Sequence, residues 1–298
     1  MFFRPGPASD PIYCTSRDGV GEHFVKGRAY LEHIWQEVGE YVDDDAAEKA
    51  MSNLLPVFWE LQVAYALKSA GKCLVPRAQR AYKKHGGPDL LIADTPDVWV
   101  EAVVVGAGTG PDALQYPELN KVYDYQSEGV LLRLRSAIQE KSVKIQQYIG
   151  KGIITPDQAT VIAISGLILP YRYSGIFPPE IVRSVYPTGN PVVEINRETG
   201  VVIGSHVEYR DQIKKSMGAE VATTVFLDPT FAHISAVLFG EAGWVDPSSP
   251  AGAEFKLVHN ATAAVKLSNS WFPVGDEYWW REGGQLERRR HEEERSKA

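Results

Sequence analysis

The chain has 298 residues, 44% of them hydrophobic and 10% aromatic, so it can bury a substantial core as one large domain or two small ones. Its 31 basic and 38 acidic residues leave a net charge of -7, which neither supports nor excludes a nucleic-acid partner, because a basic groove can lie within an acidic average. Two distant cysteines, Cys14 and Cys73, without a CxxC pair or a secretory leader, predict a cytoplasmic location, and no apolar run approaches the ~20 residues that span a bilayer, so no membrane partner is expected.

Four regions are expected in chain order. Residues 1–44 form an irregular Pro- and Gly-rich lead-in and a first helix, and residues 45–166 form the core. Residues 167–281 hold several prolines and are expected to form an insertion with a small hairpin around 191–204, followed by additional strands packed on the core. Residues 282–298 are a charged tail without apolar positions, which we expect to fray.

The core is expected to combine helices with short strands. Apolar residues at helical spacing predict helices at 22–42 and 56–71, and a third at 128–152 with a clear apolar stripe. Residues 106–127 contain early glycines and prolines and are expected to form a loop over the ends of the preceding strands. Strands are expected at 72–76, 88–93, 98–105 and 159–166, and later at 221–227, 231–239 and 255–259.

One carboxylate lies in the middle of an apolar run. In "GGPDLLIADTPDVWVEAVVV", residues 86–105, Glu101 has apolar neighbours on both faces of the expected strand, as in a central strand covered on both sides. A buried ionised carboxylate must be paired, protonated, metal-bound or open to a cleft. A short hairpin that pairs 89–93 with 98–102 would bring Asp89 close to Glu101 at one end of the sheet.

Two close carboxylates repel each other unless a divalent cation lies between them. Hard oxygen ligands suit Mg²⁺ or Mn²⁺, and the chain has no His or Cys spacing typical of a zinc site. Asp89 and Glu101 are therefore candidate ligands of Mg²⁺ or Mn²⁺.

A short motif surrounds these two acids. Pro88 and Asp89 form a "PD" pair, and twelve positions after the aspartate Glu101, Ala102 and Val103 form "EAV". This pattern resembles the signature of the PD-(D/E)XK nuclease superfamily, which has the restriction-endonuclease-like fold. The resemblance implies an α/β protein whose mixed sheet follows an α-β-β-β-α-β order through the core region, with N-terminal helices and a strand-rich C-terminal extension added to it.

Two further features resemble this family. Glu60 stands in the apolar helix "FWELQVAYAL", and "SAIQEKSVKIQQY" resembles the helix that follows the family's motif strand. The family's usual lysine at the third motif position is Val103 here, and some members carry this lysine on the following helix. Lys141 lies at the edge of the apolar stripe of helix 128–152 and is the candidate for this moved lysine. Lys144, about 60° further towards solvent, is the second candidate.

The resemblance implies a metal-dependent nuclease that hydrolyses phosphodiester bonds in nucleic acid, with DNA as the expected partner and defence or repair as the role. Asp89, Glu101, Glu60 and the backbone carbonyl of Ala102 would bind Mg²⁺ or Mn²⁺. Lys141 would orient the nucleophile or a phosphate oxygen. The oligomeric state, including a homo-oligomer, stays open.

Other interpretations of the same residues stay open. A catalytically inactive member of the fold would only bind nucleic acid or protein, with Val103 marking the loss of the lysine. A partner-binding or structural protein would use the hairpin as ordinary core. Residue by residue, Asp89 could be a turn residue, Glu101 one half of a buried salt bridge with Lys141, and Glu60 a charge on a helix face.

Two more motifs are interpreted as having no part in catalysis. The glycine-rich stretch 106–110, "GAGTG", lacks the following helix and the GK[ST] ending of a P-loop, so nucleotide binding is not expected. The aromatic stretch 277–280, "EYWW", could stack on bases, but we expect it in the core or in an interface.

Overall fold

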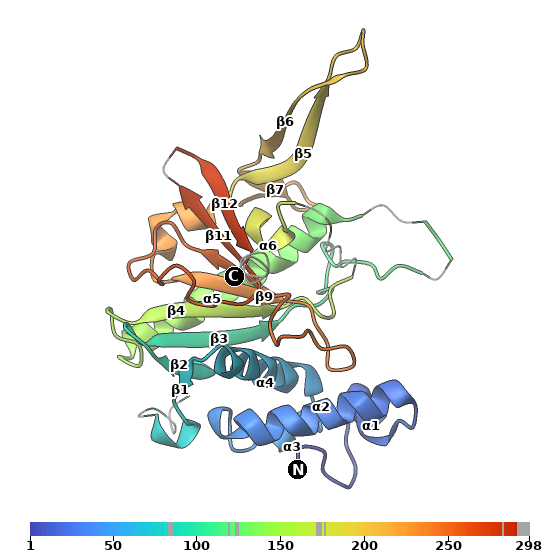
Figure 1. Cartoon of the computed structure of the whole chain (residues 1–298), viewed down its shortest axis with the longest axis vertical. Coiled ribbons are helices and arrows are strands. Elements are labelled where there is room, and N and C mark those ends of the chain that lie inside the picture. Colours follow the sequence, from blue (N-terminus) through green and yellow to red (C-terminus); the bar gives the residue numbers. More distant parts are fainter. Residues whose placement is uncertain are drawn as a thin grey trace, which may run out of the picture.

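A mixed sheet of eight strands organises the computed structural model, which describes residues 1–80, 82, 86–118, 120–122, 125–170, 175, 177–281 and 283–290. The strands lie in the order β1-β2-β3-β4-β9-β10-β11-β12 (Figure 1). They span Cys73–Leu74 (β1), Leu90–Ala93 (β2), Val98–Val104 (β3), Ala159–Ser165 (β4), Ala236–Gly240 (β9), Lys256–His259 (β10), Asp276–Arg281 (β11) and Gln285–Arg290 (β12). β3, β4 and β9 run parallel, and β2 pairs antiparallel with β3. The predicted α/β class with a mixed sheet is confirmed.

Helices cover both faces of this sheet (Figure 1). They span Pro11–Asp18 (α1), Glu22–Val38 (α2), Ala46–Ala50 (α3), Leu54–Ser69 (α4), Ser127–Gly150 (α5) and Glu180–Arg183 (α6), with 3₁₀ turns at Gly39–Tyr41, Arg77–Gln79, Val225–Leu227 and Pro229–Phe231. Val98, Val100 and Ala102 pack into the core on the α4 face, whereas Trp99 and Val103 pack on the α5 face. The two faces of β3 are therefore the ones that the alternation of its sequence predicts.

Helix α4 is the first element that positions the site. Its backbone begins at Leu54, whose N–H donates to the buried carboxylate of Asp10 at 2.8 Å. The indole Nε1–H of Trp59 donates to the carbonyl of Ala163 on β4 at 2.9 Å, which fixes the helix on the sheet. Burial and then the charge of Asp89 raise the pKa of the next residue, Glu60, which therefore lies near the end of β2.

Two terminal segments differ from the expectation. Residues 1–20 were expected to be irregular, but α1 forms there because the Asp10 side chain caps the N–H groups of Ile12 and Tyr13 and Pro11 opens the helix. The charged tail 282–298 was expected to fray, yet its residues 285–290 form β12 on β11. Its residues 282 and 291–298 lie outside the described part.

Charged pairs, together with Leu286, which packs partly buried against the core, explain why β12 forms in charged sequence. Arg288 donates to the Asp276 carboxylate at 2.7 Å, and the Arg289 guanidinium lies 5.5 Å from the centre of the Trp279 ring. Cation–π contacts and cross-strand ion pairs of this kind stabilise a strand edge that has no hydrophobic pattern.

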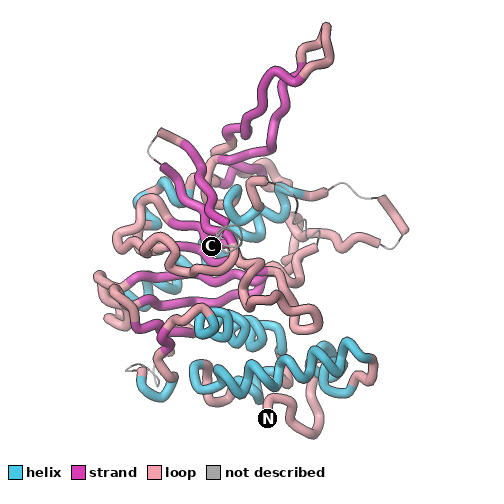
Figure 2. Tube along the Cα trace, viewed as in Figure 1, coloured by secondary structure: helices cyan, strands magenta, loops and turns pink. Residues whose placement is uncertain are grey.

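The region after β4 combines the same sheet with two hairpins. β9 pairs with β4, so strands from 167–281 extend the core sheet, as expected for strands that pack on the core. The expected hairpin forms from Thr188–Ile195 (β5) and Val202–Tyr209 (β6) and projects from the body, and a smaller one joins Gln212–Lys214 (β7) and Glu220–Ala222 (β8) (Figure 2).

Two strands of this region are shorter than expected. The run 221–227 was expected to be one strand but splits into the end of β8 and a 3₁₀ turn, and the strand expected at 231–239 begins only at Ala236.

The "EYWW" stretch lies in β11, where Tyr278 is core and Trp279 and Trp280 are half-buried. Within the described residues, no helix is long and apolar enough to cross a membrane.

Trp59→Phe should lower the free energy of unfolding by about 1–3 kcal/mol, because the buried carbonyl of Ala163 loses a donor. Urea denaturation measures the change. The matched control is Trp35→Phe, which removes the same atoms from a half-buried indole that has no hydrogen-bond partner among the described residues. Equal losses in the two variants would show that the hydrogen bond does not anchor α4.

Candidate functional site

The centre of the candidate site is the buried carboxylate of Glu101 on β3, which is 1% exposed. Its Oε1 accepts hydrogen bonds from Nζ of Lys141 at 2.7 Å and from Nζ of Lys144 at 2.5 Å. Both lysines lie on α5, three residues apart, so one helical turn presents them to the same oxygen. The expected contact between Lys141 and Glu101 is present, and Lys144 joins it.

The two lysines differ in solvent exposure. The side chain of Lys141 is 12% exposed and that of Lys144 is 42% exposed. This agrees with the helical geometry, which places Lys141 at the edge of the apolar stripe and Lys144 nearer to solvent. Burial alone would lower the pKa of Lys144, but the charge and the hydrogen bond of Glu101 outweigh it and raise that pKa above its usual range. Lys144 is therefore a cation at neutral pH.

The second oxygen of Glu101 is different. Oε2 is buried and has no hydrogen-bond partner within the described residues. Most buried polar atoms in proteins are paired, and an unpaired one marks a strained site or a missing ligand. The two lysines bind only Oε1, and a cation at Oε2 would give the second oxygen a partner.

Asp89 lies next to Glu101. β2 and β3 pair with Leu90 opposite Val100, and continuing this register by one residue places Asp89 opposite Glu101, on the same face of the sheet. The Oδ2 of Asp89 accepts a hydrogen bond from the N–H of Ala102 at 2.6 Å. Asp89 therefore reaches across to β3 and is not only a turn residue.

Burial, and next the charge of Glu101, raise the pKa of Asp89 to about 6, although the Ala102 hydrogen bond and the charges of Lys144 and Lys141 act in the opposite direction. At neutral pH the ionised form of this carboxylate therefore lowers the stability of the folded chain. A divalent cation would offset that loss, because it favours the charged form.

Pro88 removes a backbone donor at the same place. Continuing the β2–β3 register by two residues past Leu90 and Val100 places Pro88, which has no N–H to donate, opposite Ala102. Pro88 therefore cannot donate to the carbonyl of Ala102. The N–H of Ala102 binds Asp89 on the same side of β3.

Glu60 approaches the site from α4, on the other face of the sheet. Burial raises the pKa of Glu60 well above its usual range, and the charges of Asp89 and Glu101 raise it further. The three acids are therefore close enough to repel one another. Even so, no three His, Cys, Asp or Glu side chains in the described part of the chain are already arranged as a metal site.

Two residues support the site without having been predicted. Arg80 is almost fully buried and donates to the carbonyls of Asp89 at 2.6 Å and Tyr41 at 2.5 Å, which holds the PD segment in place. Burial, with a contribution from the charge of Arg77, lowers the pKa of Arg80 to about 10. Its contacts join segments far apart in sequence, so no local pattern indicates them.

Tyr148 is the other supporting residue, and it ends the "SAIQEKSVKIQQY" motif. Burial and then the charge of Glu101 raise the pKa of Tyr148, and its hydroxyl donates to the carbonyl of Gly87 at 3.3 Å. The Lys144 ammonium lies 5.6 Å from the centre of the Tyr148 ring. Its position at the end of this motif is the sequence feature that could have indicated Tyr148 as a site residue.

Removing the two lysines singly and together tests how they share Glu101. Lys144→Ala should lower the free energy of unfolding by about 1 kcal/mol or less, because this ammonium is partly solvated. Lys141→Ala should cost about 1–3 kcal/mol, and the double variant about 3–5 kcal/mol, because it leaves a buried carboxylate unpaired. Urea denaturation gives all three values. A double variant that costs no more than the sum of the single ones would show that the lysines do not substitute for each other.

The raised pKa of Asp89 predicts a pH effect. Between the ordinary value of 3.8 and about 6, the folded chain binds more protons than the unfolded chain, so this residue lowers stability as pH rises through that window. Asp89→Asn should therefore be more stable than the wild type at pH 7 by about 1–3 kcal/mol and lose that advantage at pH 4. Urea denaturation with EDTA at both pH values measures this, and an equal difference at the two pH values would contradict it.

No family model, no curated protein and no solved structure matches this chain. The function is therefore inferred from the chain's own residues and their geometry.

Proposed function

We propose that this protein is a metal-dependent nuclease of the PD-(D/E)XK type, with a restriction-endonuclease-like core, that hydrolyses phosphodiester bonds in DNA in defence or repair. The observation that carries the proposal is the Glu101 carboxylate, which has one oxygen bound by two lysines and the other buried without a partner among the described residues. The order of elements from α4 to β4, which is helix, three strands, helix and strand, is consistent with such a core.

The residues present suit a divalent cation. Glu101 through Oε2, Asp89, Glu60 and the backbone carbonyl of Ala102 would bind Mg²⁺ or Mn²⁺, since all are hard oxygen donors. The mutual repulsion of the three acids, seen in the raised pKa values of Asp89 and Glu60, is the kind of cost that a bound cation offsets. When bound, such a cation lowers the pKa of a coordinated water and neutralises charge on the scissile phosphate.

The two lysines supply the positive charge that Val103 lacks. Lys141 is mostly buried and keeps Glu101 ionised and oriented. Lys144 is partly exposed and cationic, so its flexible side chain can turn from Glu101 to a phosphate oxygen of the substrate. Because its pKa is raised, Lys144 serves as an electrostatic group and not as a general base at neutral pH.

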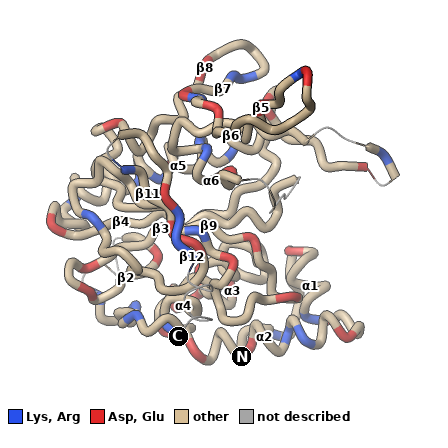
Figure 3. Tube along the Cα trace, turned by 45° about the horizontal axis from the view of Figure 1, so that its top comes forward, with Lys and Arg blue, Asp and Glu red and all other residues tan. Residues whose placement is uncertain are grey.

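DNA as the substrate rests on the family resemblance. Lysine and arginine are interspersed with aspartate and glutamate along the described chain (Figure 3). Affinity for a phosphodiester would therefore depend on local cations such as Lys144 and on the bound metal.

A specific observation also favours a second function. Two ammonium groups already neutralise Glu101, and no three-ligand metal group is formed among the described residues. A catalytically inactive member of the same fold, which binds nucleic acid or protein only, would keep this arrangement as a buried ion pair.

A cleavage assay separates the two functions. The wild type, incubated with plasmid, single-stranded DNA or RNA, should cut DNA with Mg²⁺ or Mn²⁺ and not with EDTA. Lys141→Ala should reduce the rate by ~10²-fold or more, because Glu101 loses the buried cation that keeps it ionised and oriented. Lys151→Ala, an exposed lysine at the end of α5, is the matched control and should retain activity. A wild type that binds DNA but never cuts it would support the inactive member.

Metal binding can be measured without activity. Mg²⁺ or Mn²⁺ should raise the melting temperature of the wild type at pH 7, because the cation binds the folded state only. Asp89→Asn should lose this shift and the cleavage activity while staying folded. If the cation stabilises the wild type and Asp89→Asn equally, Asp89 is not a ligand.

A further inference from the structure

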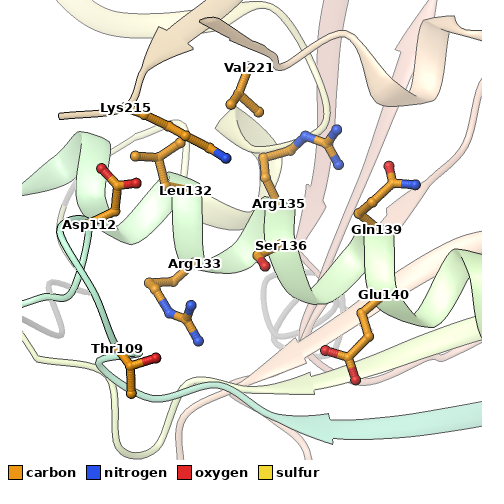
Figure 4. Close-up of a pocket in the computed structure, with 10 residues that line it drawn as sticks. All are labelled: Thr109, Asp112, Leu132, Arg133, Arg135, Ser136, Gln139, Glu140, Lys215 and Val221. Carbon is orange, nitrogen blue, oxygen red and sulfur yellow. The ribbon is translucent and has the colours of Figure 1, made fainter. Parts of the chain in front are cut away.

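A second group of polar side chains lies on the outer side of α5 (Figure 4). It surrounds a pocket of about 540 Å³ between α5, the loop that follows β3 and the β7–β8 hairpin. Its lining includes Arg133, Arg135, Ser136, Gln139 and Glu140 of α5 and Lys215 of the β7–β8 turn. On a helix with 100° per residue, Arg135 and Gln139 face away from Lys141 and Lys144, and neither these lysines nor Glu101 lines the pocket, so it is separate from the Glu101 site.

Arg135 is the unusual residue of this pocket. It is 8% exposed, its Nε–H donates to the carbonyl of Ala222 at 2.8 Å, and its guanidinium lies 5.7 Å from the centre of the Phe231 ring. Its Nη1 is buried without a hydrogen-bond partner, and no ion pair to Arg135 is found in the described part of the chain. Burial alone lowers the pKa of Arg135 to about 10, so the group is still charged at neutral pH.

A buried cation without a counter-ion is costly, and an anion bound beside it would offset that cost. Two more cations line the same pocket. Lys215 crosses above α5 towards Arg135, while Arg133 points the other way, towards Thr109 (Figure 4). The hydroxyl groups of Ser136 and Thr109 add neutral hydrogen-bond donors near these cations.

The two carboxylates of the pocket do not neutralise these cations equally. Asp112 accepts a hydrogen bond from the N–H of Ser216 at 2.7 Å, so it serves to attach the β7–β8 turn to the loop. Glu140 is exposed and makes no ion pair among the described residues. Glu140 should therefore repel an anion in the pocket, which gives a direct test of the ligand's charge.

The glycine-rich loop 106–110 has a defined place in this arrangement. Gly108 has a φ of +82°, and a Cβ there would lie 2.6 Å from the Arg133 guanidinium carbon. The Arg133 Nε–H donates to the carbonyl of Gly106 at 3.0 Å. The loop therefore holds Arg133 against the pocket and is not itself a P-loop.

We propose that this pocket binds a phosphate ester, with the phosphate between Arg135 and Lys215. A phosphate has several acceptor oxygens, which suits donors that come from a helix and a hairpin turn. The volume is that of a site for a small organic molecule, and Leu132 and Val221 provide apolar walls for the group that carries the phosphate. The ligand has two possible sources, a free nucleotide or the phosphate of a nucleic-acid strand.

Binding is measured by titration calorimetry in EDTA, which keeps the Glu101 site free of divalent cations. The probes are 5′-AMP, adenosine, and a short DNA oligomer with and without a 5′-phosphate. We expect 5′-AMP or the phosphorylated oligomer to bind, adenosine not to bind, and the unphosphorylated oligomer to bind more weakly than the phosphorylated one. Binding of 5′-AMP alone identifies a free nucleotide, and binding of the phosphorylated oligomer alone identifies a strand end.

Three variants test the residues. Arg135→Met and Lys215→Ala should each weaken binding by roughly tenfold or more, as loss of a charged hydrogen-bond donor does. Glu140→Gln should strengthen binding, because it removes a repelling charge. Lys214→Ala, an exposed neighbour of Lys215 outside the pocket, is the matched control and should bind like the wild type.

Arg135→Met should also remain folded with little change in melting temperature when no ligand is present, because it replaces an uncompensated buried charge with an apolar group. If that variant does not fold, the exposed positions Lys215 and Glu140 decide the question. Failure of every probe to bind the wild type, or unchanged binding in both Lys215→Ala and Glu140→Gln, would overturn the proposal. Neither result depends on nuclease activity.

Discussion

The ion pair between Glu101 and two lysines is the interaction on which the rest of this structure depends. A carboxylate with 1% exposure in the middle of a sheet needs opposite charge beside it. Lys141 and Lys144 supply it from α5, and they reach one oxygen only if that helix keeps a single rotation and a single position along β3. The apolar stripe of α5, which includes Ile138 and Ile145, holds the helix there.

The other acids of the candidate site lie near Glu101 at the end of β2. The β2–β3 ladder ends at Leu90, next to Asp89 and Pro88, and beyond it the N–H of Ala102 binds the Asp89 carboxylate. Trp59 fixes α4 on β4 and brings Glu60 to the same end. Carboxyl groups that repel one another lower stability, and a fold that retains them at one place is more typical of a functional site than of a structural one.

Local patterns predicted the parts of this arrangement that depend on local geometry. The alternation in 98–105 predicted the two faces of β3, and the spacing in 128–152 predicted the exposure of Lys141 and Lys144. Contacts between distant segments were not predictable in this way. The Arg80 hydrogen bonds to Tyr41 and Asp89 depend on tertiary packing that no periodicity records.

Two further differences have the same origin. The Asp10 cap that forms α1 lies in Pro- and Gly-rich sequence, where the capping signal is short and composition favours a loop. β12 forms in charged sequence because β11 provides ion-pair and aromatic partners for its arginines and Leu286 packs against the core. In both places one or two specific side chains decide the structure against the average composition.

A structural role and a catalytic role for Glu101 make different demands on the same carboxylate. A buried ion pair that served stability alone would gain by replacement with apolar residues, and the neighbours Trp99 and Val103 show that this environment accepts them. A salt bridge accounts for Oε1, which the lysines bind, but it leaves Oε2 buried without a partner and gives no reason for a second acid, Asp89, directly across the strand pair. A cation bound between these two acids accounts for both features, and therefore explains more of the site than the ion pair does.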